Sequence, residues 1–144
     1  MVSWAEVAAD QPDLAEQVER VFRARRLKTL GTIRRDGTPR LSEISGASIR
    51  DGEVWLGLIP SAKAHDVDRD PRCAIHCGSP GDEAAASARV SGRAVHSGTE
   101  PTFSRFRIDV LEVVMTVPDP ESRQIRVEWW TAANGSGRLV RPGG

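Results

Sequence analysis

The chain has 144 residues, and its 20 basic and 20 acidic side chains give a formal net charge of zero. A chain of this length most simply forms one domain around one core. Without a net positive charge, neither nucleic acid nor an anionic membrane is an expected partner, and any anion site must be local. The sequence shows no apolar run near the roughly 20 residues of a membrane span and no signal peptide features, so we expect a cytoplasmic protein.

The first predicted element is an amphipathic helix over residues 13–26, just behind Pro12. Acidic residues come early in this segment and arginines late, which suits the helix dipole. Its apolar residues recur at helical spacing, at Leu14, Val18, Val21 and Phe22.

The rest of the chain reads mainly as strands. Asp36-Gly37 and Asp51-Gly52 are two-residue turn signals between apolar runs, and Pro60 and Pro71 bracket one short helix. Strands are predicted over residues 27–34, 38–49, 54–59, 72–77, 88–97, 106–117 and 124–131. The pattern predicts a mainly β fold, a six- to seven-stranded antiparallel barrel over residues 27–132, within a single domain of residues 1–144. Residues 78–86 are expected to form an exposed loop and residues 138–144 a frayed tail.

Lysine is the scarcest charged residue, since Lys28 and Lys63 stand against eighteen arginines. Lys63 follows the third predicted strand beside Ser61, where a short helix begins. Helix-start amides with an ammonium and a hydroxyl can bind a phosphate, but a solvated lysine in a connection is an equally good interpretation of the spacing alone.

The two cysteines are predicted to be free, buried thiols and not a metal site. Cys73 and Cys77 fall on one face of one strand, roughly 13 Å apart, which is too far for a disulfide. His76 points to the opposite face, so a zinc site is disfavoured. We find no nucleophile elbow, Gly-rich dinucleotide fingerprint or P-loop, and we predict no catalytic side chain and no metal.

The order of elements and turns resembles the pyridoxamine 5′-phosphate oxidase-like split-barrel superfamily, most of all its short actinobacterial members. The resemblance rests on the Arg-Asp-Gly-Thr-Pro hairpin, the Gly-Glu-Val-Trp-Leu strand, Ser-Ala-Lys, and Asp-Arg-Asp-Pro-Arg before a strand, and it covers residues 14–98 best. It implies a split barrel and a homodimer, with a cofactor in each of two clefts built by both chains. Members bind flavin mononucleotide (FMN), the deazaflavin coenzyme F-420 or, in some branches, haem.

The resemblance also implies which residues bind the cofactor. Ser61 and Lys63 match the phosphate anchor, and Leu58, Ile59 and Pro60 would lie along the ring. The other candidates implied by the family are Arg40, Ser42 and Ser45 on the second strand.

Two departures from the family pattern bear on this site. Ala62 stands where many relatives have a second basic residue, and Asp66 would repel a phosphate unless it points away. The short segment between residues 98 and 107 argues against vitamin B6 oxidation itself.

Trp129 and Trp130 are adjacent on a predicted strand, so only one can enter the core. The other is expected at a dimer interface or, from the neighbouring subunit, over the cofactor cleft.

We therefore expect an oxidoreductase that transfers hydride between reduced F-420, slightly preferred, or FMN and a small conjugated or quinone-like substrate. The alternative is a non-catalytic protein that binds or stores a cofactor or haem. The available axial ligands are His65, His76, His96, the two cysteines and the methionines, with His96 or His76 the first to test.

Overall fold

The computed structural model describes residues 1–78 and 86–143, and it confirms the mainly β, antiparallel fold. The described residues form more strands than the six or seven predicted. The strands are β1 (Lys28–Ile33), β2 (Pro39–Ile44), β3 (Ala47–Arg50), β4 (Glu53–Leu58), β5 (Arg72–Cys77), β6 (Ser87–Thr99), β7 (Ser104–Asp119), β8 (Gln124–Thr131) and β9 (Gly135–Pro142). The helices are α1 (Trp4–Asp10), α2 (Pro12–Ala24) and α3 (Ala62–Arg69).

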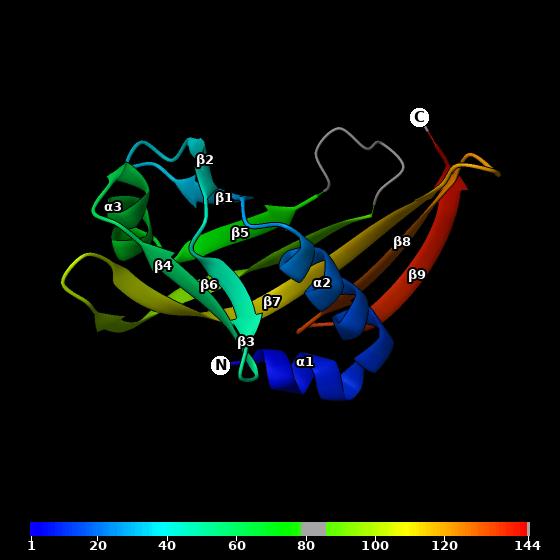
Figure 1. Ribbon diagram of the computed structural model, residues 1–144, viewed down its shortest axis with the longest axis horizontal. Helices are drawn as coiled ribbons and strands as arrows, with labels where there is room; N and C mark the ends of the chain where they lie inside the picture. The colour runs from blue at the N-terminus through cyan, green and yellow to red at the C-terminus, as the bar shows by residue number, and fades with distance from the viewer. Residues whose placement is uncertain (79–85, 144) are drawn as a thin grey trace.

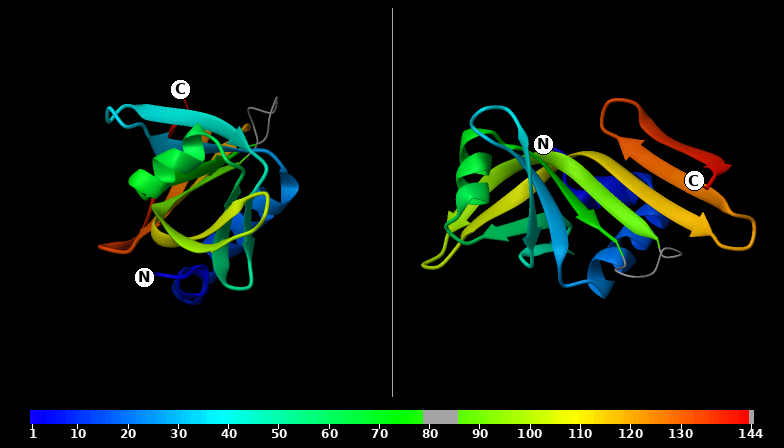
Figure 2. Two further views of the ribbon diagram at one scale, coloured as in Figure 1. Left: turned by 90° about the vertical axis from the view of Figure 1, so that its left-hand side faces the viewer. Right: turned by 90° about the horizontal axis from the view of Figure 1, so that it is seen from above.

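Seven strands curl into a barrel in the order β2-β1-β5-β6-β7-β4-β3 (Figure 2). The barrel closes because β2 leads directly into β3 through Ser45 and Gly46. The single strand predicted over residues 38–49 is therefore broken at this point. The break is stabilised from β4, where Gly57 N donates to Gly46 O at 2.8 Å.

The second half of β7 runs beyond the barrel and carries a hairpin of β8 and β9, drawn in orange and red in Figure 1. The frayed tail predicted over residues 138–144 is wrong for the part that the structure describes, because β9 pairs with β8 along its full length. Gly137 faces Trp129 in this pairing, and a Cβ on Gly137 would lie only 2.2 Å from the indole ring. The ring thus covers the glycine backbone and stabilises the end of the chain.

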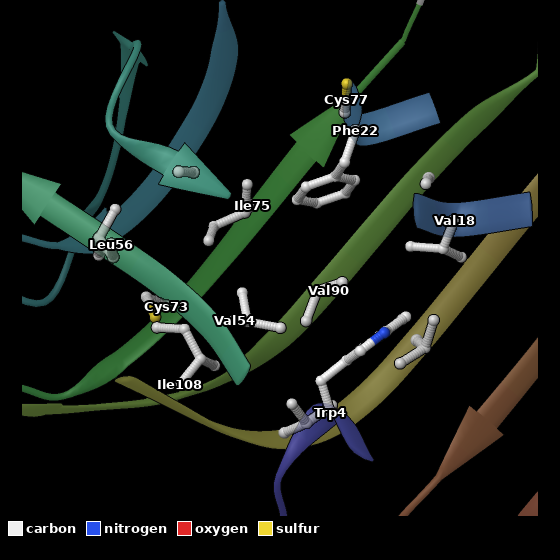
Figure 3. Packing of buried hydrophobic residues seen from close by; sticks show 14 of the residues in the cluster. Trp4, Val18, Phe22, Val54, Leu56, Cys73, Ile75, Cys77, Val90 and Ile108 are labelled. Atoms are coloured by element: carbon white, nitrogen blue, oxygen red, sulfur yellow. The ribbon is translucent and has the colours of Figure 1, made fainter. Parts of the chain in front are cut away.

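Two helices cover one opening of the barrel. α2 confirms the predicted helix with slightly different ends, whereas α1 was not predicted, although Ser3 and Glu6 form a capping box at its start. Trp4 of α1 is 2% exposed and its Nε1 donates to Glu19 of α2 at 2.7 Å. Figure 3 shows the indole of Trp4 among the apolar side chains that fill the barrel.

The loop predicted over residues 78–86 falls mostly on residues 79–85, which lie outside the described part of the chain. Among the helices that the structure describes, none combines the length and apolar character needed to cross a membrane.

Candidate functional site

A cavity of about 440 Å³ lies where β3, β4 and the start of β7 meet the connection into α3. We call it the α3 cavity. In Figure 1, β4 leads into α3 with β7 beside it. The lining residues are Glu43, Ile44, Ser45, Gly46, Ser48, Arg50, Trp55, Gly57, Leu58, Ile59, Lys63, Phe103 and Arg105. This volume falls within the usual range for small-molecule sites.

Two glycines form part of the wall of the α3 cavity. A Cβ on Gly46 would lie 2.2 Å from Gly57 O, so no other residue fits there without moving the backbone. A Cβ on Gly57 would lie 3.4 Å from the ring of Phe103. The absence of side chains at both positions lets the backbone at Gly46, the backbone at Gly57 and the Phe103 ring pack closely together in the cavity wall.

Positive charge dominates the lining of the cavity. Lys63, Arg50 and Arg105 are cations, and Glu43 is the one carboxylate among the lining residues. Arg50 Nη1 lies 3.2 Å from Asp51 Oδ2 at the exposed β3–β4 turn. The cavity is thus suited to an anionic ligand.

The two arginines converge on one aromatic ring. The guanidinium carbons of Arg50 and Arg105 lie 5.1 Å and 5.3 Å from the centre of the Trp55 ring. Nε of Arg105 is buried and has no hydrogen-bond partner among the described residues. A buried donor without an acceptor is costly, so Arg105 is poised for an external acceptor.

The start of α3 is held by Ser61. Its Oγ accepts from Ala64 N at 3.4 Å and donates to Ile59 O at 2.8 Å, which makes Ser61 the N-cap of the helix. The hydroxyl proton is therefore engaged within the chain in this conformation. Lys63, the second residue of the helix, lines the cavity.

Asp66 does point away from the cavity, into a buried cluster that joins α3 to β1 and β2. Its carboxylate accepts from Thr32 Oγ1 at 2.8 Å and Arg40 Nε at 2.7 Å, and Arg69 Nη2 lies 3.3 Å away. Burial raises the pKa of Asp66, but the hydrogen bonds from Arg40, Thr32 and Arg69 outweigh it and lower the pKa overall. The cluster fixes the position of the helix that carries Lys63.

The structure brings together only part of the predicted site. The predicted residues that line the α3 cavity are Ser45, Leu58, Ile59 and Lys63. Pro60 and Ser61 lie in the connection to α3, and neither Arg40 nor Ser42 lines the cavity. Arg40 instead donates to Asp66, which the sequence alone did not indicate.

The two tryptophans lie far along the sheet from α3, on the β8–β9 hairpin. Trp130 is 8% exposed, and its Nε1 donates to Asp10 of α1 at 3.1 Å, so it belongs to the core of its own chain. Trp129 is half-buried and lines a second cavity of about 520 Å³ between α2 and the hairpin, which we call the hairpin cavity.

In the hairpin cavity the arginines form ion pairs within the chain. Glu128 Oε1 lies 2.9 Å from Arg126 Nε and 4.0 Å from Arg138 Nε. Arg126 Nη2 also donates to Gln17 of α2 at 3.3 Å. These contacts tie the hairpin to α2.

This architecture is shared with known proteins. The model of the family described as pyridoxamine 5′-phosphate oxidase matches residues 14–133. The chain belongs to this family. Among the curated proteins, none matches the chain in sequence.

Solved structures of pyridoxamine 5′-phosphate oxidase-like proteins share the fold. PhzG from Burkholderia lata, in complex with tetrahydrophenazine-1-carboxylic acid, has a TM-score of 0.69 at 13% identity, covering 94% of this chain and 91% of its own. An FMN binding protein from Nostoc punctiforme has a TM-score of 0.64 at 11% identity, covering 88% and 94%. A heme binding protein from Mycobacterium smegmatis has a TM-score of 0.62 at 13% identity, covering 92% and 89%.

Other features that the sequence singled out are structural in this family member. Lys28 is 6% exposed and donates to Arg25 O, and burial lowers its pKa. Cys73 and Cys77 are free and buried as predicted, with His76 on the opposite face of β5. In residues 1–78 and 86–143, no three metal-ligating side chains gather into a site.

Arg50 and Arg105 line the cavity but were not predicted from the sequence. One signal was present: Trp55 lies between Val54 and Leu56, so a large aromatic side chain points to the outer face of β4. Arg105 pairs with Gly57 in the neighbouring strand, which no local pattern reveals.

Proposed function

We propose that the protein is an oxidoreductase that binds a flavin-type cofactor in the α3 cavity, either F-420 or FMN. The observation that carries the proposal is the excess of positive charge in a partly apolar cavity at the start of α3. Membership of the pyridoxamine 5′-phosphate oxidase family and the likeness to an FMN binding protein and to PhzG support the same cofactor class.

The residues present fit such a cofactor. The phosphate would be held by Lys63 and by the free amides of the first turn of α3. Leu58, Ile59 and Phe103 offer apolar surface to a flat ring. When bound, a reduced flavin-type cofactor supplies a hydride, and solvent supplies the proton that completes reduction of a small conjugated or quinone-like acceptor.

The side chains of the cavity then bind, orient and exclude water, without a general acid or base. Lys63 fixes the anionic end of the cofactor, and the Asp66 cluster fixes α3 beneath Lys63. The apolar wall keeps water from the reacting face.

A titration tests this proposal. Purified protein is titrated with FMN, F-420 and haem, and the titration is repeated with Lys63→Ala and with Arg20→Ala, an exposed arginine of α2 that pairs with Glu16. We expect one flavin-type cofactor to bind, and Lys63→Ala to weaken it by about tenfold or more, as for a charged hydrogen bond. Arg20→Ala should leave affinity unchanged. If none of the three binds, the proposal is wrong, and if Lys63→Ala binds normally, the anchor role is wrong.

Haem is the second candidate, because the chain shares its fold with a heme binding protein over 92% of its length. The residues that line the α3 cavity include no His, Cys or Met that would serve as an axial ligand. His96 is exposed, bonds to Thr99 and packs edge-on against Phe106. The flavin class is therefore favoured, and a Soret band on haem addition that is lost in His65→Ala, His76→Ala or His96→Ala would favour the alternative.

We also propose that the active form is a homodimer in which Trp129 of one subunit covers the α3 cavity of the other. Trp130 is buried against its own α1, whereas Trp129 is half-buried and so is the tryptophan available to a partner. Sedimentation of the wild type should show a dimer. Trp129→Ala should weaken cofactor binding more than Trp55→Phe, and a monomeric wild type would exclude the arrangement.

A further inference from the structure

The α3 cavity has cationic groups at two separate places. Strand β4 ends at Leu58. Lys63 lies beyond that end, and Trp55 lies three residues before it. At about 3.3 Å per residue, Trp55 and Leu58 are roughly 10 Å apart along the strand. The guanidiniums of Arg50 and Arg105 meet at the Trp55 ring and belong to β3 and β7, whereas Lys63 belongs to α3.

We propose that Arg105, with Arg50 and the Trp55 ring, forms a carboxylate subsite, and that the substrate of this enzyme is a flat conjugated molecule bearing a carboxylate. This inference rests on the proposed function for its redox role, because the acceptor must lie beside the cofactor. It adds the chemical class of the substrate.

The buried Nε of Arg105 is the first argument. It lacks a hydrogen-bond partner among the described residues, and Arg105 forms no ion pair with them. A guanidinium offers Nε and one terminal nitrogen as parallel donors that match the two oxygens of a carboxylate. A carboxylate at this edge would satisfy Nε and neutralise the charge.

The second argument is the positive charge that the two arginines bring to one aromatic ring. Both guanidinium carbons lie within 5.3 Å of one ring centre, with Asp51 as the acidic neighbour of Arg50 alone. Side chains of Asp51 and Arg50 are 80% and 52% exposed, so solvent screens this pair. An anion bound beside this ring would offset the positive charge that remains.

The third argument is the shape of the surroundings. Trp55 and Phe103 supply aromatic surface beside the cations. A conjugated ring can pack on these side chains while its carboxylate reaches Arg105. The carbonyl oxygen of a neutral substrate could accept from the Nε of Arg105, but it would leave the charge of the guanidinium uncompensated.

The test uses 2-naphthoate and its neutral isostere 2-naphthamide as probes, with calorimetric binding to the full-length protein, with and without saturating FMN or F-420. For the wild type we expect 2-naphthoate to bind at least about tenfold more tightly than 2-naphthamide, as for a charge-assisted pair. Arg105→Gln should remove this preference, and Arg50→Gln should reduce it less because Arg50 is more exposed. Arg89→Gln, which removes an arginine of β6 paired with Glu112 of β7, should leave this preference unchanged.

Arg105→Lys is a second variant, in case loss of the charge affects folding, and thermal unfolding checks all variants. Since lysine lacks the parallel donors, it should keep only part of the preference. Equal binding of the two probes, or loss of both in Arg105→Gln, would overturn the proposal. A loss of F-420 affinity in Arg105→Gln with naphthoate preference retained would assign these arginines to the cofactor and also overturn it.

Failure of the proposed function is distinguishable from failure of this inference. If no cofactor binds but the apoprotein prefers 2-naphthoate through Arg105, the carboxylate subsite stands and the flavin role falls. If a cofactor binds through Lys63 and the probes are not distinguished, the flavin role stands and the subsite falls.

Discussion

The α3 cavity and the hairpin cavity contain the same kinds of side chain, arginine and tryptophan, yet they differ in how the charges are paired. In the hairpin cavity, Glu128 lies beside two arginines and Gln17 accepts from one of them. In the α3 cavity, Lys63 and Arg105 form no ion pair with any described residue. Arginines that are paired within the chain fix its parts together, whereas unpaired ones in a cavity are available to a ligand.

The sharpest test of this comparison is between two carboxylates that each face two arginines. The Asp66 side chain is 4% exposed and that of Glu128 is 19% exposed. Asp66→Asn should lower the free energy of unfolding by about 3 kcal/mol, because it leaves Arg40 and Arg69 without their buried partner.

Glu128→Gln should cost less than about 1 kcal/mol, since its arginines reach solvent or Gln17. Urea unfolding of both variants measures the two losses of unfolding free energy. Equal losses of unfolding free energy would mean that the Asp66 and Glu128 clusters contribute equally to stability.

A second pair of variants tests the two close glycines. Gly46→Ala places a Cβ 2.2 Å from the Gly57 carbonyl oxygen, and Gly137→Ala places one 2.2 Å from the Trp129 ring. Backbone of a closed barrel cannot move easily, so we expect a loss of about 2 kcal/mol at Gly46.

At Gly137, the half-buried indole can swing outward, and a loss of about 1 kcal/mol is expected. Thermal unfolding measures both. A larger loss at Gly137 would show that the hairpin is the more rigid region.

Charge removal should affect cofactor binding in one cavity only. Lys63→Ala should weaken binding of the cofactor about tenfold, or about 1.4 kcal/mol, whereas Arg126→Gln should change it less than about twofold because Arg126 is already paired. Fluorescence titration with FMN or F-420 gives both values. A comparable loss in the two variants would contradict the distinction between the cavities.

Acid should destabilise the α3 region through Asp66, with a smaller effect than the substitutions. The pKa of Asp66 is lowered in the folded state, so its contribution to stability is present above the unfolded pKa and is lost as the pH falls through the folded pKa. Burial raises the pKa of Asp66 while its hydrogen bonds lower it, so the net lowering of the pKa is smaller than the hydrogen bonds alone would give. Unfolding free energy should therefore fall more steeply below about pH 4 in the wild type than in Asp66→Asn. Parallel curves would remove Asp66 as the responsible group.

Sequence patterns predicted those parts of the fold that local residues determine. The two-residue turn at Asp51-Gly52 is confirmed, and both residues have the positive φ that such a turn requires. At Asp36-Gly37 the chain also turns, but only Gly37 has a positive φ and the turn is longer, because Gly37 N donates to Arg34 O. The strand break at Gly46 was not predicted, because it depends on the backbone of Gly57 from another strand. The prediction of a frayed tail was wrong for a similar reason, since β9 is stabilised by the Trp129 ring of β8.

The predictions of cofactor-binding residues were limited in the same way, by contacts that local sequence does not reveal. Lys63 was found because it follows a recognisable strand and precedes a helix. Arg40 was predicted to bind the cofactor, but its Nε donates to Asp66 Oδ2, 26 residues away in sequence. The partner of a long side chain is decided by tertiary packing, which neither spacing nor resemblance specifies.

The buried cysteines make the chain easy to label at a chosen position. Burial raises the pKa of Cys73 to about 12 and also raises that of Cys77, so neither offers a reactive thiolate near neutral pH. A single cysteine introduced at exposed Ser136 of β9 should therefore react alone with a maleimide dye. Mass spectrometry should find one dye per chain, and the dye would then report when the hairpin approaches a second subunit.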